Sequence, residues 1–196
     1  MPHVVPRFLR LAILPFIFGC VTGRIQQPNA ILRVATSPAP ATRRFGTLHL
    51  SSVQHLPMNY VAEDSAVKVT WAQHDTYMGL KVENKTKAAI RILWDDAAMV
   101  GRPGNSERLL PTGARYLTRD ESHPPAVVPP GAYWIGGLTP VDNITLDGSK
   151  WTVAPLFNPR FGPGDARILL PIVIDGVQYD YEFTFAVQNA PAHGRR

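Results

Sequence analysis

The 196-residue chain contains one cysteine, Cys20, so it cannot form a disulfide within itself. It carries no acidic residue before Glu63. It also lacks a Gly-x-Ser-x-Gly motif, which argues against a serine hydrolase with a nucleophile elbow. The apolar run at positions 11–18 is much shorter than the about 20 residues that an α-helix needs to span a bilayer. Beyond this run, no stretch of the chain shows a helical apolar stripe, so we expect little helix.

Because no acidic residue precedes Glu63, the excess positive charge of the chain lies in its N-terminal part. Six arginines precede Glu63, whereas all 15 acidic residues and the other 14 of the 20 basic ones lie from Glu63 onward, so that part is nearly neutral. A nucleic-acid-binding surface needs clustered Lys and Arg on the folded domain, so we expect no nucleic-acid partner. A basic segment near a membrane gains about 1 kcal/mol per residue from anionic lipids. A solvated tether with incidental arginines explains the same pattern.

The N-terminus has the pattern of a secretory signal. Arg7 and Arg10 form a basic region, residues 11–18 an apolar region, and Gly19 a small residue before a cleavage point. Pro15 weakens the apolar run as a helix. The signal peptide is therefore predicted at residues 1–19.

The four residues Ile17-Phe18-Gly19-Cys20 resemble the lipobox of bacterial lipoproteins. The resemblance implies that Cys20 becomes the acylated first residue of the mature chain, with two or more acyl chains as stable anchoring requires. Val21 in place of aspartate implies, by the same resemblance, sorting to the outer membrane. The alternative is an ordinary buried cysteine near an N-terminal helix.

After the signal we predict three parts. Residues 20–44 are interpreted as a lipidated flexible tether, because they contain Pro-rich segments and no aromatic residue. Residues 45–190 are predicted to form one domain, since about 176 residues suffice for one domain and a tether. Residues 191–196 are predicted to be a disordered tail.

Alternating apolar and polar residues predict strands through the domain. The clearest runs before the C-terminal region are residues 66–71, 78–83 and 89–94. The polar turn at residues 84–87 joins the last two as an antiparallel hairpin.

The strongest hairpin signal lies near the C-terminus. Asp175-Gly176 is typical of a type I′ turn, and it separates the β-rich runs 167–174 and 177–185. Tyr179, Tyr181, Phe183 and Phe185 should share the buried face, and Gln178, Asp180, Glu182 and Thr184 the opposite one. Pro171 must then sit at a strand edge or bulge.

Seven or more short strands at this spacing predict an all-β fold, an antiparallel β-sandwich of the immunoglobulin-like kind. The domain also resembles a group of bacterial secreted lipoproteins of unknown function, over about residues 78–187. The motifs that carry this resemblance are Asn84-Lys85-Thr86, Trp94-Asp95, Gly104, Gly113, Pro124-Pro125, Leu170-Pro171-Ile172 and Tyr181-Glu182-Phe183. The resemblance implies an exported β-rich domain and transfers no catalytic residue.

Few residues suggest chemistry. Acids gather at Asp95-Asp96 and at Asp120-Glu121, the latter beside His123 in a Pro-rich loop. Adjacent acids on a strand point to opposite faces, and the Glu121/His123 spacing matches no zinc pattern, so we predict no metal site and no cofactor. The serines and the other histidines form no recognisable catalytic set, and no catalytic residue is assigned.

Two further patterns have simple interpretations. Asn84-Lys85-Thr86 and Asn143-Ile144-Thr145 match the glycosylation sequon, although a turn and a loop explain them equally well. Trp71, Trp94, Trp134 and Trp151 fit a hydrophobic core better than a ligand platform.

The sequence thus predicts a lipoprotein anchored by acyl chains on Cys20, acting as a binding or scaffolding module in the cell envelope and not as an enzyme. We expect a protein partner in an envelope assembly and no small-molecule ligand. The rival interpretation is an envelope enzyme or enzyme accessory that handles carbohydrate or metal, which requires a concave site with convergent polar groups.

Overall fold

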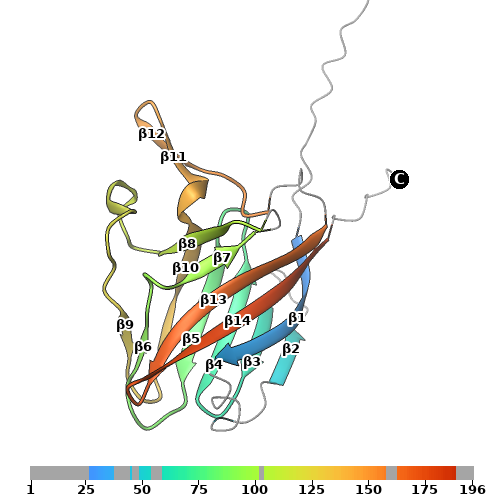
Figure 1. Cartoon of the computed structure of the whole chain (residues 1–196), viewed down its shortest axis with the longest axis vertical. Coiled ribbons are helices and arrows are strands. Elements are labelled where there is room, and N and C mark those ends of the chain that lie inside the picture. Colours follow the sequence, from blue (N-terminus) through green and yellow to red (C-terminus); the bar gives the residue numbers. More distant parts are fainter. Residues whose placement is uncertain are drawn as a thin grey trace, which may run out of the picture.

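The computed structural model describes residues 27–37, 45, 49–53, 59–101, 104–157 and 163–188, and these residues confirm an all-β fold (Figure 1). All strand pairs in these ranges are antiparallel, and two short 3-10 turns, Tyr116–Thr118 and Val141–Asn143, lie between strands. Within the described ranges, no helix has the length and apolarity to cross a membrane. Cys20, the predicted signal peptide and the predicted tail at residues 191–196 lie outside the described residues.

Fourteen strands make up the described structure. They are β1 (Gln27–Ser37), β2 (His49–Val53), β3 (Asn59–Glu63), β4 (Val67–Gln73), β5 (Met78–Asn84), β6 (Ile90–Ile92), β7 (Ala98–Val100), β8 (Ser106–Pro111), β9 (Ala126–Val128), β10 (Tyr133–Pro140), β11 (Ile144–Asp147), β12 (Lys150–Val153), β13 (Gly164–Ile174) and β14 (Val177–Gln188).

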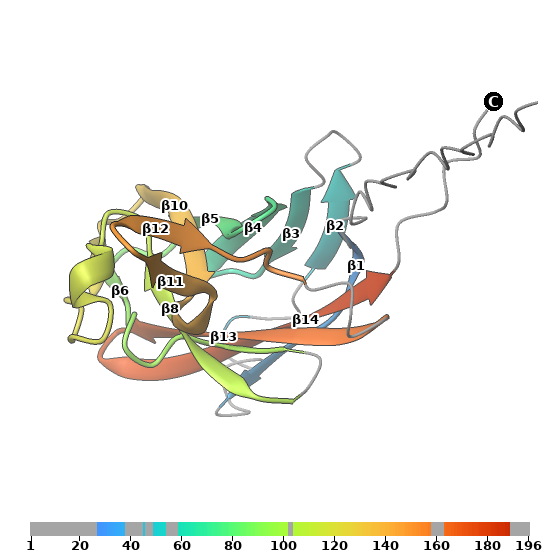
Figure 2. The same ribbon diagram turned by 90° about the horizontal axis from the view of Figure 1, so that it is seen from above.

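The strands lie in two layers that face each other (Figure 2). One layer contains β1, β14 and β13, with β6 and β7 attached to β13, and the other runs β10-β5-β4-β3-β2. Strand β8 joins the layers, because it pairs with β7 on one side and with β10 on the other. Strands β11 and β12 form a separate hairpin that projects from one end (Figure 1).

Aromatic side chains fill the space between the layers. The Trp71 ring of β4 contacts Phe183 and Phe185 of β14 edge to face, at centroid distances of 5.1 and 5.9 Å. Tyr60 of β3 meets Phe185 in the same way at 5.9 Å. Such T-shaped pairs add about 0.5–1.5 kcal/mol each beyond the burial of their area.

The C-terminal hairpin confirms the predicted turn and the predicted aromatic face. Asp175 and Gly176 have φ angles of 50° and 78°, as a type I′ turn requires, and Ile174 pairs with Val177 across it. All four aromatic residues of the predicted face are buried.

Thr184 differs from the prediction, because it is buried although it lies on the face predicted to be polar. Strand β14 is flanked on both sides, so this short side chain lies in register between Arg33 of β1 and Arg167 of β13. Within the described residues its hydroxyl has no hydrogen-bond partner.

Pro171 lies inside β13 and not at the edge of the sheet. On the side away from β14, β13 pairs with β7 as far as Leu169 and with β6 from Ile172 onward. Pro171 occupies the break between these two partners, and its carbonyl oxygen accepts a hydrogen bond from the Leu93 N–H at 3.0 Å. Where the neighbouring strand is interrupted, no ladder hydrogen bond from the N–H of residue 171 is required, so proline is tolerated there as it is at a sheet edge.

Strand β1 differs from the sequence-based interpretation, which placed residues 27–37 in the tether. These residues pair with β14 from Gln27↔Gln188 to Ser37↔Asp180. The register shifts twice, between Pro28 and Ala30 and between Ile31 and Arg33. Each shift breaks the period-two alternation by which a strand is recognised in a sequence, so the pattern was hidden.

Candidate functional site

A concave feature lies on the outer face of the β10-β5-β4 layer, away from the aromatic core. It is a hollow of about 730 Å³. The turn between β4 and β5 bounds it on one side, and the chain after β8 bounds it on the other. Its volume lies in the range of about 300–1,000 Å³ that is typical of ligand sites.

Small residues form the floor of the hollow. Ala72 of β4, Gly79 of β5 and Gly137 of β10 are direct cross-strand neighbours and form one row across three strands. Because side chains alternate between the faces of a strand, the residues beside them, Trp71, Leu80 and Leu138, point into the core. The outer face of the layer therefore carries small residues where the inner face carries large side chains.

Two stacked rings lie against this floor. The rings of His74 and Tyr77 are nearly parallel, with centroids 4.2 Å apart, and the turn that carries them is closed by a 3.0 Å hydrogen bond from the His74 N–H to the Tyr77 carbonyl. A β-carbon at Gly137 would come within 2.6 Å of Tyr77 Cδ2, and one at Gly79 within 3.3 Å of His74 Nε2. The glycines thus make room for the ring pair, which is a reason to find glycine inside a strand.

The opposite wall is fixed by Thr112. Its hydroxyl accepts a hydrogen bond from the Gly137 N–H at 2.7 Å, and its own N–H donates to the Gly137 carbonyl at 2.8 Å. Behind this wall a second, small apolar cluster of Leu110, Val141 and Ile144 supports the projecting hairpin. The wall is therefore built on packed residues.

An aromatic contact holds the upper part of the same wall. Tyr116 meets Trp151 of β12 edge to face at 5.8 Å, and the Arg119 guanidinium lies over the Trp151 ring at 5.4 Å from its centroid. Tyr116 also lines the hollow.

The polar groups of the hollow are mostly neutral. Thr70, Thr76 and Thr139 contribute hydroxyl groups, whereas the Thr112 hydroxyl is already bonded to Gly137. No aspartate or glutamate is among the described lining residues. The one ammonium group of this lining, on Lys81, forms an ion pair with Glu83 at 3.0 Å and lies 4.5 Å above the Tyr133 ring. This set can exchange hydrogen bonds with hydroxyl or amide groups, whereas acid–base catalysis by a carboxylate has no residue there.

Of the acidic residues singled out in the sequence, Asp95 is hydrogen-bonded to Ser122 and His123. Asp95 accepts hydrogen bonds from the Ser122 hydroxyl and, at 2.8 Å, from the His123 N–H. The Ser122 hydrogen bond is the main reason that the pKa of Asp95 lies below its usual value. The His123 ring instead has Nδ1 2.8 Å from the Glu121 carbonyl, so the three side chains form no Ser-His-Asp relay.

The remaining acids of this region, Asp96, Asp120 and Glu121, are exposed. Across the described ranges no group of three His, Cys, Asp or Glu side chains is placed to hold a metal ion. The Asp95 cluster closes a loop on the surface and is distinct from the hollow.

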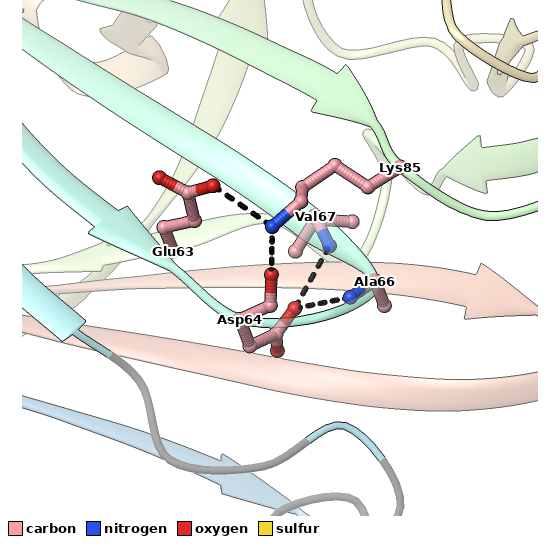
Figure 3. Close-up of polar contacts among 5 residues, drawn as sticks. All are labelled: Glu63, Asp64, Ala66, Val67 and Lys85. Atoms are coloured by element: carbon pink, nitrogen blue, oxygen red, sulfur yellow. Dashed lines mark hydrogen bonds and ion pairs between the residues drawn. The ribbon is translucent and has the colours of Figure 1, made fainter.

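A buried polar corner was missed in the sequence. Asp64 is buried between β3 and β4, and its Oδ1 accepts hydrogen bonds from the N–H groups of Ala66 and Val67, both at 2.8 Å (Figure 3). Its Oδ2 accepts a 3.0 Å hydrogen bond from the Tyr181 hydroxyl of β14, which ties one layer to the other. Burial, then the nearby charge of Asp64, raises the pKa of Tyr181.

Lys85 completes this corner. Its ammonium group bonds the Asp64 carbonyl oxygen at 2.6 Å and the Glu63 carboxylate at 2.8 Å (Figure 3). The polar groups joined in Figure 3 satisfy one another, so the corner is a structural joint.

Asn84, the first residue of one sequon, is also structural. Its side-chain amide donates to the carbonyls of Ala88 and Val128, at 2.8 and 2.9 Å, and it is buried. A buried, fully bonded amide is not available as a glycan acceptor. Trp71 and Trp94 are in the core as expected, the latter 4.7 Å from Trp134.

Sequence reasoning did not find the hollow, although one signal was available. Gly79, Gly136 and Gly137 lie inside alternating strand patterns, where glycine marks a bulge or a close approach. That signal names no partner for the glycines, because the contacts come from a turn and from a loop. Comparisons with protein-family models, with curated proteins and with solved structures found no match, so the function has to be argued from this geometry.

Proposed function

We propose that this chain is a lipid-anchored binding module of the bacterial cell envelope, sorted to the outer membrane, and that the hollow is its binding site. The proposed lipid anchor is supported by the lipobox-like sequence ending at Cys20. The proposed binding domain is supported by the two-layered antiparallel structure, which we interpret as an immunoglobulin-like sandwich.

The observation that carries the proposal is the hollow itself. It is concave, largely apolar and lined by convergent neutral polar groups, and these are the properties of a ligand site. Because a cavity of this size has room for a small molecule, our proposal departs here from the expectation that none binds.

A role as an enzyme that cleaves glycosidic bonds has less support. Such enzymes use a pair of carboxyl groups across the scissile bond, and the described lining contains none. The site therefore favours binding without bond cleavage, including a role as the ligand-binding accessory of an enzyme.

The binding role is tested by purification from membranes with the anchor intact. Ala72→Leu fills the floor of the hollow, whereas Lys68→Leu places the same side chain on the same face of β4 outside the lining. We expect material bound by the wild-type protein and by Lys68→Leu to be lost from Ala72→Leu. Equal recovery from all three proteins would place the binding site elsewhere.

The anchor is tested separately with a clickable fatty acid. Cys20→Ala should incorporate no label, because the thiol that receives the acyl chain is absent. Label retained in this variant would show that Cys20 is not the acylated residue.

A further inference from the structure

We infer that the ligand of the hollow is an oligosaccharide, bound through the rings of the His74–Tyr77 stack and the threonine hydroxyls. This inference rests on the proposed function and adds the chemical class of the ligand. Three features of the site lead to it.

The first feature is that the backbone at the centre of the floor is already paired. Strand β4 pairs with β3 and β5, β5 with β4 and β10, and β10 with β5 and, from Leu138 to Pro140, with β8. Next to this segment both backbone groups of Gly137 are bonded to Thr112. An extended peptide that binds by strand addition needs unpaired N–H and C=O groups along an edge, so it cannot add at the centre of the floor.

The second feature is the combination of flat apolar surface with hydroxyl groups. Ala72, the half-buried Gly79 and the Tyr77 ring that lies over Gly137 give an apolar surface, and Ile135 extends it along β10. Thr70 of β4 and Thr139 of β10 lie on the same outer face of the layer, and a threonine hydroxyl both donates and accepts hydrogen bonds. A sugar ring has the matching form, with C–H groups on its faces and hydroxyl groups around its rim.

The third feature is the charge of the lining. The one ammonium group among the described lining residues, on Lys81, is paired with Glu83, and the same lining holds no carboxylate. A strongly charged ligand would lack a counter-charge at this site, and a neutral oligosaccharide needs none.

The open side of the hollow indicates a chain of sugars. Tyr133 and Ile135 point outward from β10 beside the hollow, with 59% and 67% of their surfaces exposed. Exposed apolar residues that continue a pocket extend the surface on which further rings can pack. We therefore expect affinity to rise with the length of the saccharide.

The test is a titration of the full-length ¹⁵N-labelled protein with neutral tetrasaccharides of glucose and of N-acetylglucosamine. The amide signals of Gly79 and Gly137 report directly on the floor. We expect them to shift on titration with at least one tetrasaccharide, with the matching monosaccharide binding more weakly. Ala72→Leu should weaken the dissociation constant by roughly tenfold or more, and Lys68→Leu should leave it within about twofold.

Three results would overturn the inference. One is the absence of floor shifts with every tetrasaccharide while Ala72→Leu still abolishes the recovery of membrane material, which keeps the binding module but excludes a sugar as its ligand. Another is saccharide binding that Ala72→Leu leaves unchanged. The third is recovery of a protein alone, dependent on the hollow, which would assign the site to a peptide ligand instead.

Discussion

The two faces of strands β4, β5 and β10 follow different rules. On the inner face Trp71, Leu80 and Leu138 are buried in the core, where Trp71 packs against the aromatic residues of β14. On the outer face Ala72, Gly79 and Gly137 leave a hollow that a turn and a loop only partly cover. The difference teaches that one side of this layer is filled, which stabilises the fold, and that the other is open, which is what a binding surface requires.

The largest expected effect is on the filled side. Phe183→Ala should destabilise the domain by about 3–5 kcal/mol, because it removes a fully buried ring that contacts Trp71. Glu182→Ala, on the opposite face of β14, loses a partly exposed ion pair with Arg167 and should cost less than about 1 kcal/mol. Urea denaturation measures both, and equal losses would contradict the assignment of the two faces.

The next effect concerns the joint between the layers. Tyr181→Phe removes the hydroxyl that donates to the buried Asp64 carboxylate, and it should cost about 1.5–3 kcal/mol at pH 7. Asp180→Ala, at the neighbouring position of β14, is the control and should remain close to the wild type. A loss for Tyr181→Phe that cannot be distinguished from that of the control would mean that the joint contributes nothing to stability.

The same tyrosine predicts a pH dependence. Burial raises the pKa of Tyr181 and raises that of Tyr60 to about 12, so the folded protein keeps protons that the unfolded chain releases above about pH 10. The stability that these groups contribute is fully present below pH 10 and is lost as the pH rises further, by up to about 1.4 kcal/mol per pH unit for each tyrosine. Denaturation at pH 8, 10 and 11 should show this fall, and Tyr181→Phe should reduce its slope. A stability independent of pH up to 11 would contradict it.

On the open side we expect Gly137→Ala to destabilise the domain by about 1–3 kcal/mol. Gly137→Ala brings a β-carbon within 2.6 Å of Tyr77 and 2.9 Å of Thr112 Oγ1, so the ring stack must move. Tyr77→Ala in the same chain removes the main clash, and the double variant should recover part of the loss. Thermal unfolding of the single and double variants decides whether the two residues are coupled, since additive losses would mean that they are not.

The smallest effect is expected from Lys81→Ala. Its ion pair with Glu83 and its contact with Tyr133 are partly exposed to solvent, so we expect a loss below about 1 kcal/mol that shrinks further in salt. A loss comparable to that of Phe183→Ala would mean that the outer face, too, is part of the stabilising core.

The parts that sequence alone predicted are local. The C-terminal hairpin is encoded by Asp175-Gly176 and by the alternation on either side, and both signals lie close together in the chain, between positions 167 and 185. The strand patterns of β4 and β5 are equally local, and each has one buried face. The predicted hairpin between residues 78–83 and 89–94 is wrong, because β5 pairs with β4 and β10, whereas β6 pairs with β9 and β13.

What the sequence did not reveal depends on distant partners. Asp64 accepts local hydrogen bonds from Ala66 and Val67, but it joins the two layers only because Tyr181, far along the chain, donates to its carboxylate. The floor of the hollow exists only when Gly79 lies beside Gly137, and this register is set by pairing across the whole layer. Strand β1 was hidden for another reason, since its two register shifts remove the alternation that marks a strand.

Strand β1 also limits the distance between Cys20 and the domain. Its first residue, Gln27, is already paired with Gln188, so only the short segment 21–26 separates Cys20 from the sheet. Seven residue steps span at most about 25 Å when fully extended. If Cys20 carries the acyl chains as proposed, the body cannot move far from the lipid surface. Its ligand would have to be met close to the membrane, within the layer of molecules that coats it.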